Sequence, residues 1–396
     1  MFTGWKRTVV LVAAALAVGL LWVGLTTAGK PKPPAPPPPG KIVFQLGASD
    51  IAPNENWEMN ADGTGKVYIA PGLGGYSPDY ALGGTPSAGK YDAAGGRWFL
   101  KVEESEQVLY RWGPDGQLYP FYGRELFAYG YVGGQWTRIQ VTNIASDGYQ
   151  DSYEHPQSGV WSNDGLDSFV SIRAHKHELD GNGYYLPGVE AMHVIRLHVS
   201  GLELGRGFQP ISAVNDARFE IVMTVVPSRS SRDGEPGWEY PIIYRHHWDP
   251  TGTKLVYILE VVFYGDYGGY YRDLFAYVRD LTTWEDTPIG QNVENPFDCR
   301  WSPQGDKIVL NQAGALWTVN PDGTGLVKLL DSNTEDYYYP FFSPDGQWLV
   351  YRAHTWSPKG TQSWIRRVPV AGGSQVNLTN DTNKYVQKYP EGWFAQ

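Results

Sequence analysis

Residues 342–351 read Phe342-Ser-Pro-Asp-Gly-Gln-Trp-Leu-Val-Tyr351, and this stretch decides the fold. Ser, Pro and Gly in this order are typical of a tight reversing turn, because Pro presets φ and Gly accepts φ > 0. The aromatic and β-branched run after the turn predicts a strand. The stretch therefore predicts a hairpin corner that leads into a strand.

An aromatic residue opens a similar phrase at four other places, which are Tyr91-Asp-Ala-Ala-Gly95, Trp161-Ser-Asn-Asp-Gly165, Trp248-Asp-Pro-Thr-Gly252 and Trp301-Ser-Pro-Gln-Gly305. A second turn recurs farther along the unit, at Asn60-Ala-Asp-Gly-Thr-Gly65, Asn320-Pro-Asp-Gly-Thr-Gly325 and, in degenerate form, Ala371-Gly-Gly-Ser374. The last two openers lie 41 residues apart (301 to 342). This spacing fits one four-stranded blade of a β-propeller.

These phrases resemble the WD40-like repeats of the TolB-type β-propeller family, whose blades carry a W-S-P-D-G phrase, a strand and an N-x-D-G-T turn. The similarity is close in the C-terminal third, looser around Trp161 and Trp248, and weakest around Tyr91. The resemblance implies an all-β, exported propeller that binds another macromolecule on one face. TolB proteins carry an α/β domain before the propeller, whereas these repeats follow a proline-rich linker, so a role in the Tol system does not carry over.

The two ends of the chain predict how the ring closes. Residues 388–394 match the start of a blade, and Lys41-Ile-Val-Phe44 together with residues 57–69 supplies its later strands. We therefore expect a six-bladed propeller of four-stranded antiparallel blades, closed by pairing of the terminal strands. The expected spans are 41–70 with 388–396, 84–142, 155–211, 240–288, 295–330 and 338–379. The strand-like run Phe219–Val226 has no place in this count, and an insertion or a distorted seventh blade would account for it.

The first 40 residues predict export. Lys6 and Arg7 precede an apolar run, residues 8–25, and Thr26-Thr-Ala28 offers small residues for cleavage, as in a secretory signal peptide. The run is also long enough to span a bilayer, so an uncleaved anchor that tethers the protein is the alternative. We expect a signal peptide or anchor helix over 1–28, a stiff proline-rich linker over 29–40, and the propeller over 41–396. The expected location is periplasmic, cell-surface or secreted.

Composition narrows the functional classes. The formal net charge of -10 makes nucleic acid an unsuitable partner, because phosphate groups would be repelled. The single cysteine, Cys299, can form no internal disulfide and is expected to be a buried core thiol. No G-x-S-x-G nucleophile elbow occurs, which argues against a serine hydrolase.

Long, irregular loops rich in Tyr, Trp and His are expected on one face of the propeller, because second-to-third loops and blade connections share a face. Insertions on one face of a repeat array usually mark the binding face. Tyr and Trp suit sugar stacking or protein anchoring, although blades also use them as filler. The candidate binding-face residues are His155, His175, His177, Tyr184, Tyr185, His246, Tyr267, Tyr270, Tyr271, Tyr337, Tyr338 and Trp356.

The leading interpretation is a non-catalytic binding module for a protein or carbohydrate of the cell envelope, with no catalytic residues and no cofactor. The alternative is a metal-dependent polysaccharide lyase. His175 and His177 alternate onto one side of an extended segment beside Glu178 and could meet His155 or His246, which makes them the metal candidates. Propellers of the oligogalacturonate-lyase type use a histidine-ligated metal, and a packed, non-ligating role for the histidines is the other interpretation.

Overall fold

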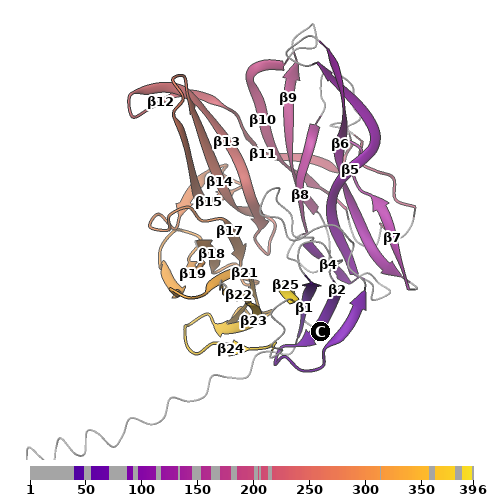
Figure 1. Ribbon diagram of the computed structural model, residues 1–396, viewed down its shortest axis with the longest axis vertical. Helices are drawn as coiled ribbons and strands as arrows, with labels where there is room; N and C mark the ends of the chain where they lie inside the picture. Colours follow the sequence, from indigo (N-terminus) through magenta and orange to yellow (C-terminus); the bar gives the residue numbers. More distant parts are fainter. Residues whose placement is uncertain are drawn as a thin grey trace, which may run out of the picture. The chain divides into compact units, whose positions relative to one another are not determined.

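Antiparallel β-strands, joined by turns and loops, make up most of the described part of the chain (Figure 1). The computed structural model describes residues 40–48, 55–70, 87–91, 97–112, 117–132, 134–144, 153–161, 170–179, 185–199, 204, 207–212, 216–312, 314–355, 362–379 and 386–394. All of them belong to one compact unit, Pro37–Gln396.

Five of the sheets formed by the described strands have four strands each. The first joins β25 (Val386–Phe394) to β1 (Lys41–Ala48), β2 (Glu55–Asn60) and β3 (Val67–Ala70). The second contains β4 (Ser87–Tyr91), β5 (Arg97–Trp112), β6 (Leu118–Val132) and β7 (Gln135–Gln140). The third contains β8 (Tyr153–Trp161), β9 (Val170–Leu179), β10 (Tyr185–Leu197) and β11 (Phe219–Val225).

The last two four-stranded sheets contain β17 (Asp298–Trp301), β18 (Ile308–Gln312), β19 (Ala315–Val319) and β20 (Val327–Leu330), and then β21 (Asp336–Phe342), β22 (Trp348–Thr355), β23 (Gln362–Pro369) and β24 (Val376–Asn377). Between the third sheet and these two lies a five-stranded sheet. Its strands are β12 (Ser228–Arg232), β13 (Glu235–Trp248), β14 (Lys254–Gly265), β15 (Tyr270–Asp280) and β16 (Asp286–Ile289).

Contacts join neighbouring sheets in sequence order into a closed cycle. Strand β4 contacts β8, β10 contacts β13, β13 contacts β17, β17 contacts β21, and β21 contacts β25, which in turn contacts β4. Most of these contacts involve the first strand of a sheet, so the first strands are the innermost ones. Each sheet therefore packs against two others, as the blades of a β-propeller do, and the predicted all-β propeller fold is confirmed.

The prediction that every blade has four strands is wrong for the sheet of β12 to β16. Its extra strand, β12, pairs with β13 through Asp233-Gly234, whose φ angles of 53° and 82° are those of a type I′ hairpin turn. The expected end of the preceding blade at residue 211 is also wrong, because the run Phe219–Val226, which had no place, supplies its outer strand β11. No aromatic-opener phrase marks either strand, so the repeat pattern does not reveal them.

The predicted closure by the two ends of the chain is confirmed. Strand β1 pairs with β25 in the register Lys41↔Phe394 and Ile42↔Trp393, and with β2 on its other edge. Ile42, Phe44 and Trp393 pack in one hydrophobic core with side chains from the sheet of β21 to β24. The closure is therefore made by both backbone pairing and side-chain packing.

The repeated turns form as predicted. Gly63, Gly305, Gly323 and Gly346 all have positive φ, and each amide donates a hydrogen bond to the carbonyl three residues earlier. The aromatic openers Trp248, Trp301 and Phe342 are buried, and the side chain of Trp161 lies outside the described residues. Cys299 is a free, fully buried thiol, and burial raises its pKa well above the ordinary value.

The predicted signal or anchor segment and the proline-rich linker lie outside the described residues, which begin at Gly40. Within the part of the chain that the structure describes, no helix is long and apolar enough to cross a membrane.

Candidate functional site

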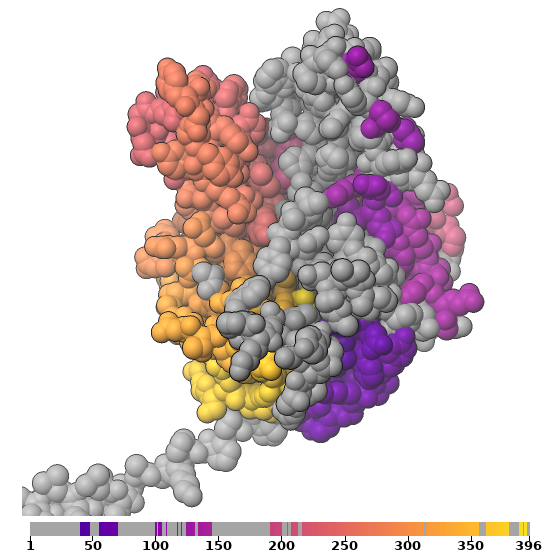
Figure 2. All heavy atoms as spheres, in the orientation of Figure 1, coloured from indigo at the N-terminus to yellow at the C-terminus, as the bar shows by residue number. Residues whose placement is uncertain are grey.

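The five-stranded sheet of β12 to β16 lies in the upper left of the view in Figures 1 and 2. A row of large side chains crosses β12 to β15 on one face of this sheet. Arg229 pairs with Trp238, Trp238 with Tyr264, and Tyr264 with Tyr270, across the neighbouring strands β12, β13, β14 and β15. Directly opposed residues of antiparallel strands point to the same side of a sheet, so the four side chains share a face. We call these four residues, with Tyr240, the aromatic face.

The rings of the aromatic face contact one another and remain accessible. The centroids of Tyr264 and Tyr270 are 5.4 Å apart, those of Tyr240 and Tyr264 are 5.6 Å apart, and the Arg229 guanidinium lies 5.2 Å from the Trp238 ring centroid. Tyr264 is 51% exposed and Tyr270 58% exposed. Large, adjacent and exposed aromatic rings are a feature of interaction surfaces.

Paired charges surround the aromatic face. Both terminal nitrogens of Arg229 donate to the Asp266 carboxylate at 2.9 Å, and Arg272 pairs with Glu260. Glu235 Oε1 accepts hydrogen bonds from the amides of Tyr267 and Gly269, at 2.6 and 3.2 Å, and so holds the turn between β14 and β15. The charged side chains around the aromatic face are therefore already paired with other residues of this sheet and of its β14–β15 turn.

The three tyrosines predicted from this loop have different environments. Tyr267, in the turn, is 85% exposed, and Tyr270 belongs to the aromatic face. Tyr271 lies on the reverse side of the sheet, because successive residues of a strand alternate. There it is half-buried against Phe263 and stacks with Arg232 at 4.5 Å, and a hydrogen bond to Asp233 raises its pKa.

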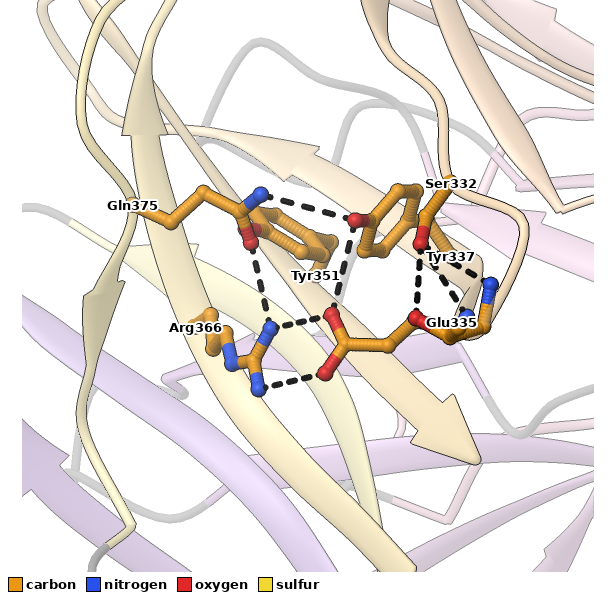
Figure 3. Close-up of polar contacts among 7 residues, drawn as sticks. Ser332, Glu335, Tyr337, Tyr351, Arg366 and Gln375 are labelled. Carbon is orange, nitrogen blue, oxygen red and sulfur yellow. Dashed lines mark hydrogen bonds and ion pairs between the residues drawn. The ribbon is translucent and has the colours of Figure 1, made fainter. Parts of the chain in front are cut away.

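Tyr337 is only 2% exposed, and it belongs to an internal network between β21, β22 and β23 (Figure 3). Glu335 and Arg366 form a two-pronged ion pair with distances of 2.6 and 2.9 Å. The Tyr337 hydroxyl donates to Glu335 at 3.4 Å, and the Tyr351 hydroxyl donates to Gln375 at 2.6 Å. The buried ring of Tyr337 therefore contributes to packing within the blade and not to an exposed surface.

The other predicted residues lie on inner strands or outside the described part. His246 is 1% exposed on β13, and Tyr338 is half-buried with its ring centroid 5.7 Å from Phe297 and 6.2 Å from His354. The backbone register places His155 directly opposite His175. For His155, His175, His177 and Tyr185 only the backbone is described, while Tyr184 and Trp356 lie outside the described residues.

Among the described residues, no group of three or more His, Cys, Asp or Glu side chains could hold a metal ion. The side chains of the predicted metal candidates His175 and His177 are not part of that set. Their backbone positions on β9 lie two residues apart, with His177 opposite Glu190 of β10.

Sequence reasoning did not identify Arg229, Trp238, Tyr240 and Tyr264 as site residues. Two signals could have found them. The Asp233-Gly234 pair is a hairpin signature, and Trp238 and Tyr240 alternate as the residues of one strand face do. Together they indicate a hairpin that presents large rings on one side.

No family model matches the chain. Among solved structures, TolB from Acinetobacter baumannii is similar with 15% identity and a TM-score of 0.48, over 90% of this chain and 67% of that chain. An oligogalacturonate lyase in complex with manganese has 16% identity and a TM-score of 0.36, over 74% of this chain and 72% of that one. A chain of a nidogen/laminin complex has 10% identity and a TM-score of 0.45, over 89% and 97%. The sequence identity is 16% or less in each case, so the assignment of the propeller fold rests on the strand pairing and the sheet contacts described above.

Proposed function

We propose that this chain is an exported six-bladed β-propeller that acts as a non-catalytic binding module in the cell envelope, and that its aromatic face binds a protein partner. The observation that carries the proposal is the continuous row of Arg229, Trp238, Tyr264 and Tyr270 across four strands, with Tyr264 and Tyr270 more than half exposed. Trp, Tyr and Arg are the residue types that dominate binding energy at protein interfaces.

The orientation of the rings favours a protein over a carbohydrate. The ring planes of Tyr240 and Tyr264 meet at 78°, and those of Tyr264 and Tyr270 at 59°. A sugar ring stacks best on a flat aromatic platform, whereas rings set at steep angles leave ridges and hollows that suit side chains of a protein. The ion pairs of Arg229 and Arg272 around the rings resemble the polar rim of a protein interface.

The test uses the full chain, tagged and cross-linked in the envelope of its own host. We expect a defined partner to be cross-linked to the parent and not to the triple variant Trp238→Ala, Tyr264→Ala, Tyr270→Ala. The purified partner should bind the triple variant at least about 30-fold more weakly than it binds the parent. The matched control replaces Tyr68 and Trp284, which are exposed outside the aromatic face.

Two outcomes would contradict the proposal. Equal partner binding by the parent and the triple variant would show that the aromatic face is not the interface. Binding of purified envelope polysaccharide to the parent but not to the triple variant would show that the occupant is a carbohydrate. Melting temperatures of the parent and both variants separate loss of binding from loss of folding.

We further propose that residues 1–28 direct export and that an uncleaved run over 8–25 would tether the propeller to a membrane. The support is the sequence pattern of two basic residues, an apolar run and small residues. N-terminal sequencing of the protein isolated from its host distinguishes the two forms. A start just after Ala28 indicates cleavage, and an intact N-terminus in the membrane fraction indicates an anchor.

A further inference from the structure

Strand β12 forms an exposed edge of the five-stranded sheet. It pairs with β13 along one side, and no other described strand pairs with it. Three of its five residues, Ser228, Arg229 and Ser231, are exposed. The outer side of β12 therefore has no partner strand within the described part of the chain.

The hydrogen bonds of the β12–β13 hairpin show which backbone groups of β12 point outward. Ser231 lies opposite Pro236, which has no amide hydrogen, and the Pro236 carbonyl accepts the Asp266 amide at 2.9 Å, on the side of β14. Bonded and non-bonded pairs alternate along antiparallel strands, so the amides and carbonyls of Ser231 and Arg229 point away from β13. Among the described residues, no backbone hydrogen bond outside the sheets involves these four groups.

The outward groups of β12 can accept one more strand. An edge strand with unpaired amides and carbonyls pairs readily with an extended segment of another chain. The charged side chains do not block this edge, because Arg229 and Arg232 are held over the sheet by Asp266 and Asp273. On one side of the sheet, the side chains of an added strand lie directly beside the aromatic face, whose row begins at Arg229.

Negative charge exceeds positive charge around β12. Residues 228–242 and 259–274 carry three arginines and six carboxylates, which gives a net charge of -3. Each arginine pairs with one carboxylate, so Asp233, Glu235 and Glu239 have no arginine partner among the described residues. The register places Glu235 and Glu239 on the side of the hairpin away from the aromatic face. Positive side chains of an added strand therefore fit that side.

We propose that β12 binds an extended segment of the partner protein by strand pairing, and that basic side chains alternate with apolar ones in this segment. The apolar side chains lie beside the rings of the aromatic face, and the basic ones lie on the side of Glu235 and Glu239. A second copy of this chain fits less well, because both copies bring the same negative charge. The proposal rests on the proposed function, since it specifies how the partner's backbone binds next to the aromatic face.

The first test titrates the full parent chain with a capped peptide of alternating Lys and Val, about ten residues long, and with a matched peptide in which Glu replaces Lys. We expect the lysine peptide to bind and the glutamate peptide not to bind. In the complex, hydrogen exchange of the Arg229 and Ser231 amides should slow at least about 10-fold, as read by mass spectrometry at single-residue resolution. The Ser230 amide, which points toward β13, is the internal control and should change less.

The second test removes one outward amide. Ser231→Pro deletes that donor and no hydrogen bond of the hairpin, and Ser231→Ala is the matched control that keeps the amide. We expect Ser231→Pro to weaken binding of the lysine peptide about 10-fold or more, and Ser231→Ala to leave it unchanged. Melting temperatures separate loss of binding from loss of folding.

Three results of these tests would overturn the proposal. They are a lysine peptide that does not protect the Arg229 and Ser231 amides, equal binding of that peptide by Ser231→Pro and the parent, and a dimer of the parent that Ser231→Pro abolishes. The dimer would show that a second copy occupies the edge of β12.

Cross-linking in the host envelope separates this proposal from the proposed function. Loss of the partner from both Ser231→Pro and the triple variant of the aromatic face supports the pairing with β12. Loss from the triple variant alone overturns this pairing and leaves the aromatic face as the interface. Retention of the partner by the triple variant overturns the proposed function and this proposal with it.

Discussion

His354 illustrates how burial at a single residue makes stability depend on pH. It is 3% exposed on β22, and burial and the nearby charge of Arg352 lower its pKa to about 4, against the opposing effect of Asp336. The ordinary pKa of the unfolded chain is about 6.5. As pH falls from about 6.5 to about 4, the unfolded chain takes up this proton first, so stability is lost over that window.

We therefore predict that His354→Gln reduces the loss of stability between about pH 7 and about pH 4.5, measured by urea unfolding at both pH values. Part of the loss should remain, because the pKa of buried His247 is lowered in the same direction. The same pH dependence in parent and variant would contradict the prediction.

The ion pair of Glu335 and Arg366 gives a second prediction at the scale of residues. Because both side chains are mostly buried, Glu335→Gln leaves Arg366 without its countercharge, and we expect a loss of about 1–3 kcal/mol in the free energy of unfolding. Asp331→Asn, which removes an exposed pair with Lys328, should change it by less than about 0.5 kcal/mol. Equal effects in urea unfolding would contradict this account.

Sequence alone could not assign individual tyrosines to a surface. In the run Tyr337-Tyr338-Tyr339, a register shift in β21 and the positive φ of Tyr339, 53°, interrupt the simple alternation of side chains. Such a bulge leaves no signature in a run of identical residues. Tyr270 and Tyr271 were likewise predicted together, although alternation along β15 separates them onto opposite faces.

The recurring N-x-D-G-T turn is also a contact between sheets, which gives a prediction at the scale of elements. A Cβ on Gly323 would lie 2.8 Å from the carbonyl oxygen of Pro288 in β16, and one on Gly63 would lie 2.7 Å from that of Leu378, just after β24. In both cases the turn packs on the outermost part of the preceding sheet. Glycine is therefore required at both positions because the backbone has a positive φ and because a Cβ would clash with the neighbouring sheet.

We predict that Gly323→Ala lowers the free energy of unfolding by about 2–4 kcal/mol, because backbone strain adds to the clash. Gly372→Ala is the matched control. Its φ, +85°, is close to the +81° of Gly323, but a Cβ there would meet nothing within 4 Å, so it should lose only about 1–2 kcal/mol. Chemical denaturation measures the free energy of unfolding of both variants. An equal loss in the two would show that the close approach to Pro288 does not add to the destabilisation.

At the scale of elements, the sequence predicted strands and turns wherever the aromatic-opener phrase occurs. It failed between residues 212 and 239, where β11 follows a long connection and β12 belongs to a hairpin outside the repeat. Of the aromatic face, only Tyr270 was predicted. Three of the four missed residues, Arg229, Trp238 and Tyr240, stand on the hairpin that the repeat pattern does not include.

Ring closure gives a prediction for the whole molecule. Trp393 is buried in the core that joins the sheets of β1 and β21, so we expect Trp393→Ala to lower the free energy of unfolding by about 3–5 kcal/mol. Trp284→Ala, at an exposed position, should change it by less than about 0.5 kcal/mol. Removal of residues 386–396 should lower the free energy of unfolding further, because β1 then also loses its pairing with β25. A melting temperature of the truncated chain within a few degrees of the parent would contradict this prediction.

The propeller and its closure by the two ends of the chain could be read from the sequence, because repeated turns and matching half-blades are local patterns. The side chains that meet between sheets, such as Val256 of β14 and Trp301 of β17, could not, since they lie on different sheets. Such contacts depend on distances between sheets, which no local pattern encodes.

Pairing of β1 with β25 also affects the order of events during synthesis. Lys41 leaves the ribosome about 350 residues before its partner Phe394, a delay of roughly 20 to 70 s at ordinary elongation rates. During that time one edge of β1 can accept the last strand of another copy, and the exchanged product would be a dimer with two closed rings. We expect refolding at high protein concentration to yield such dimers and refolding at low concentration to yield monomers, a difference that size-exclusion chromatography would reveal.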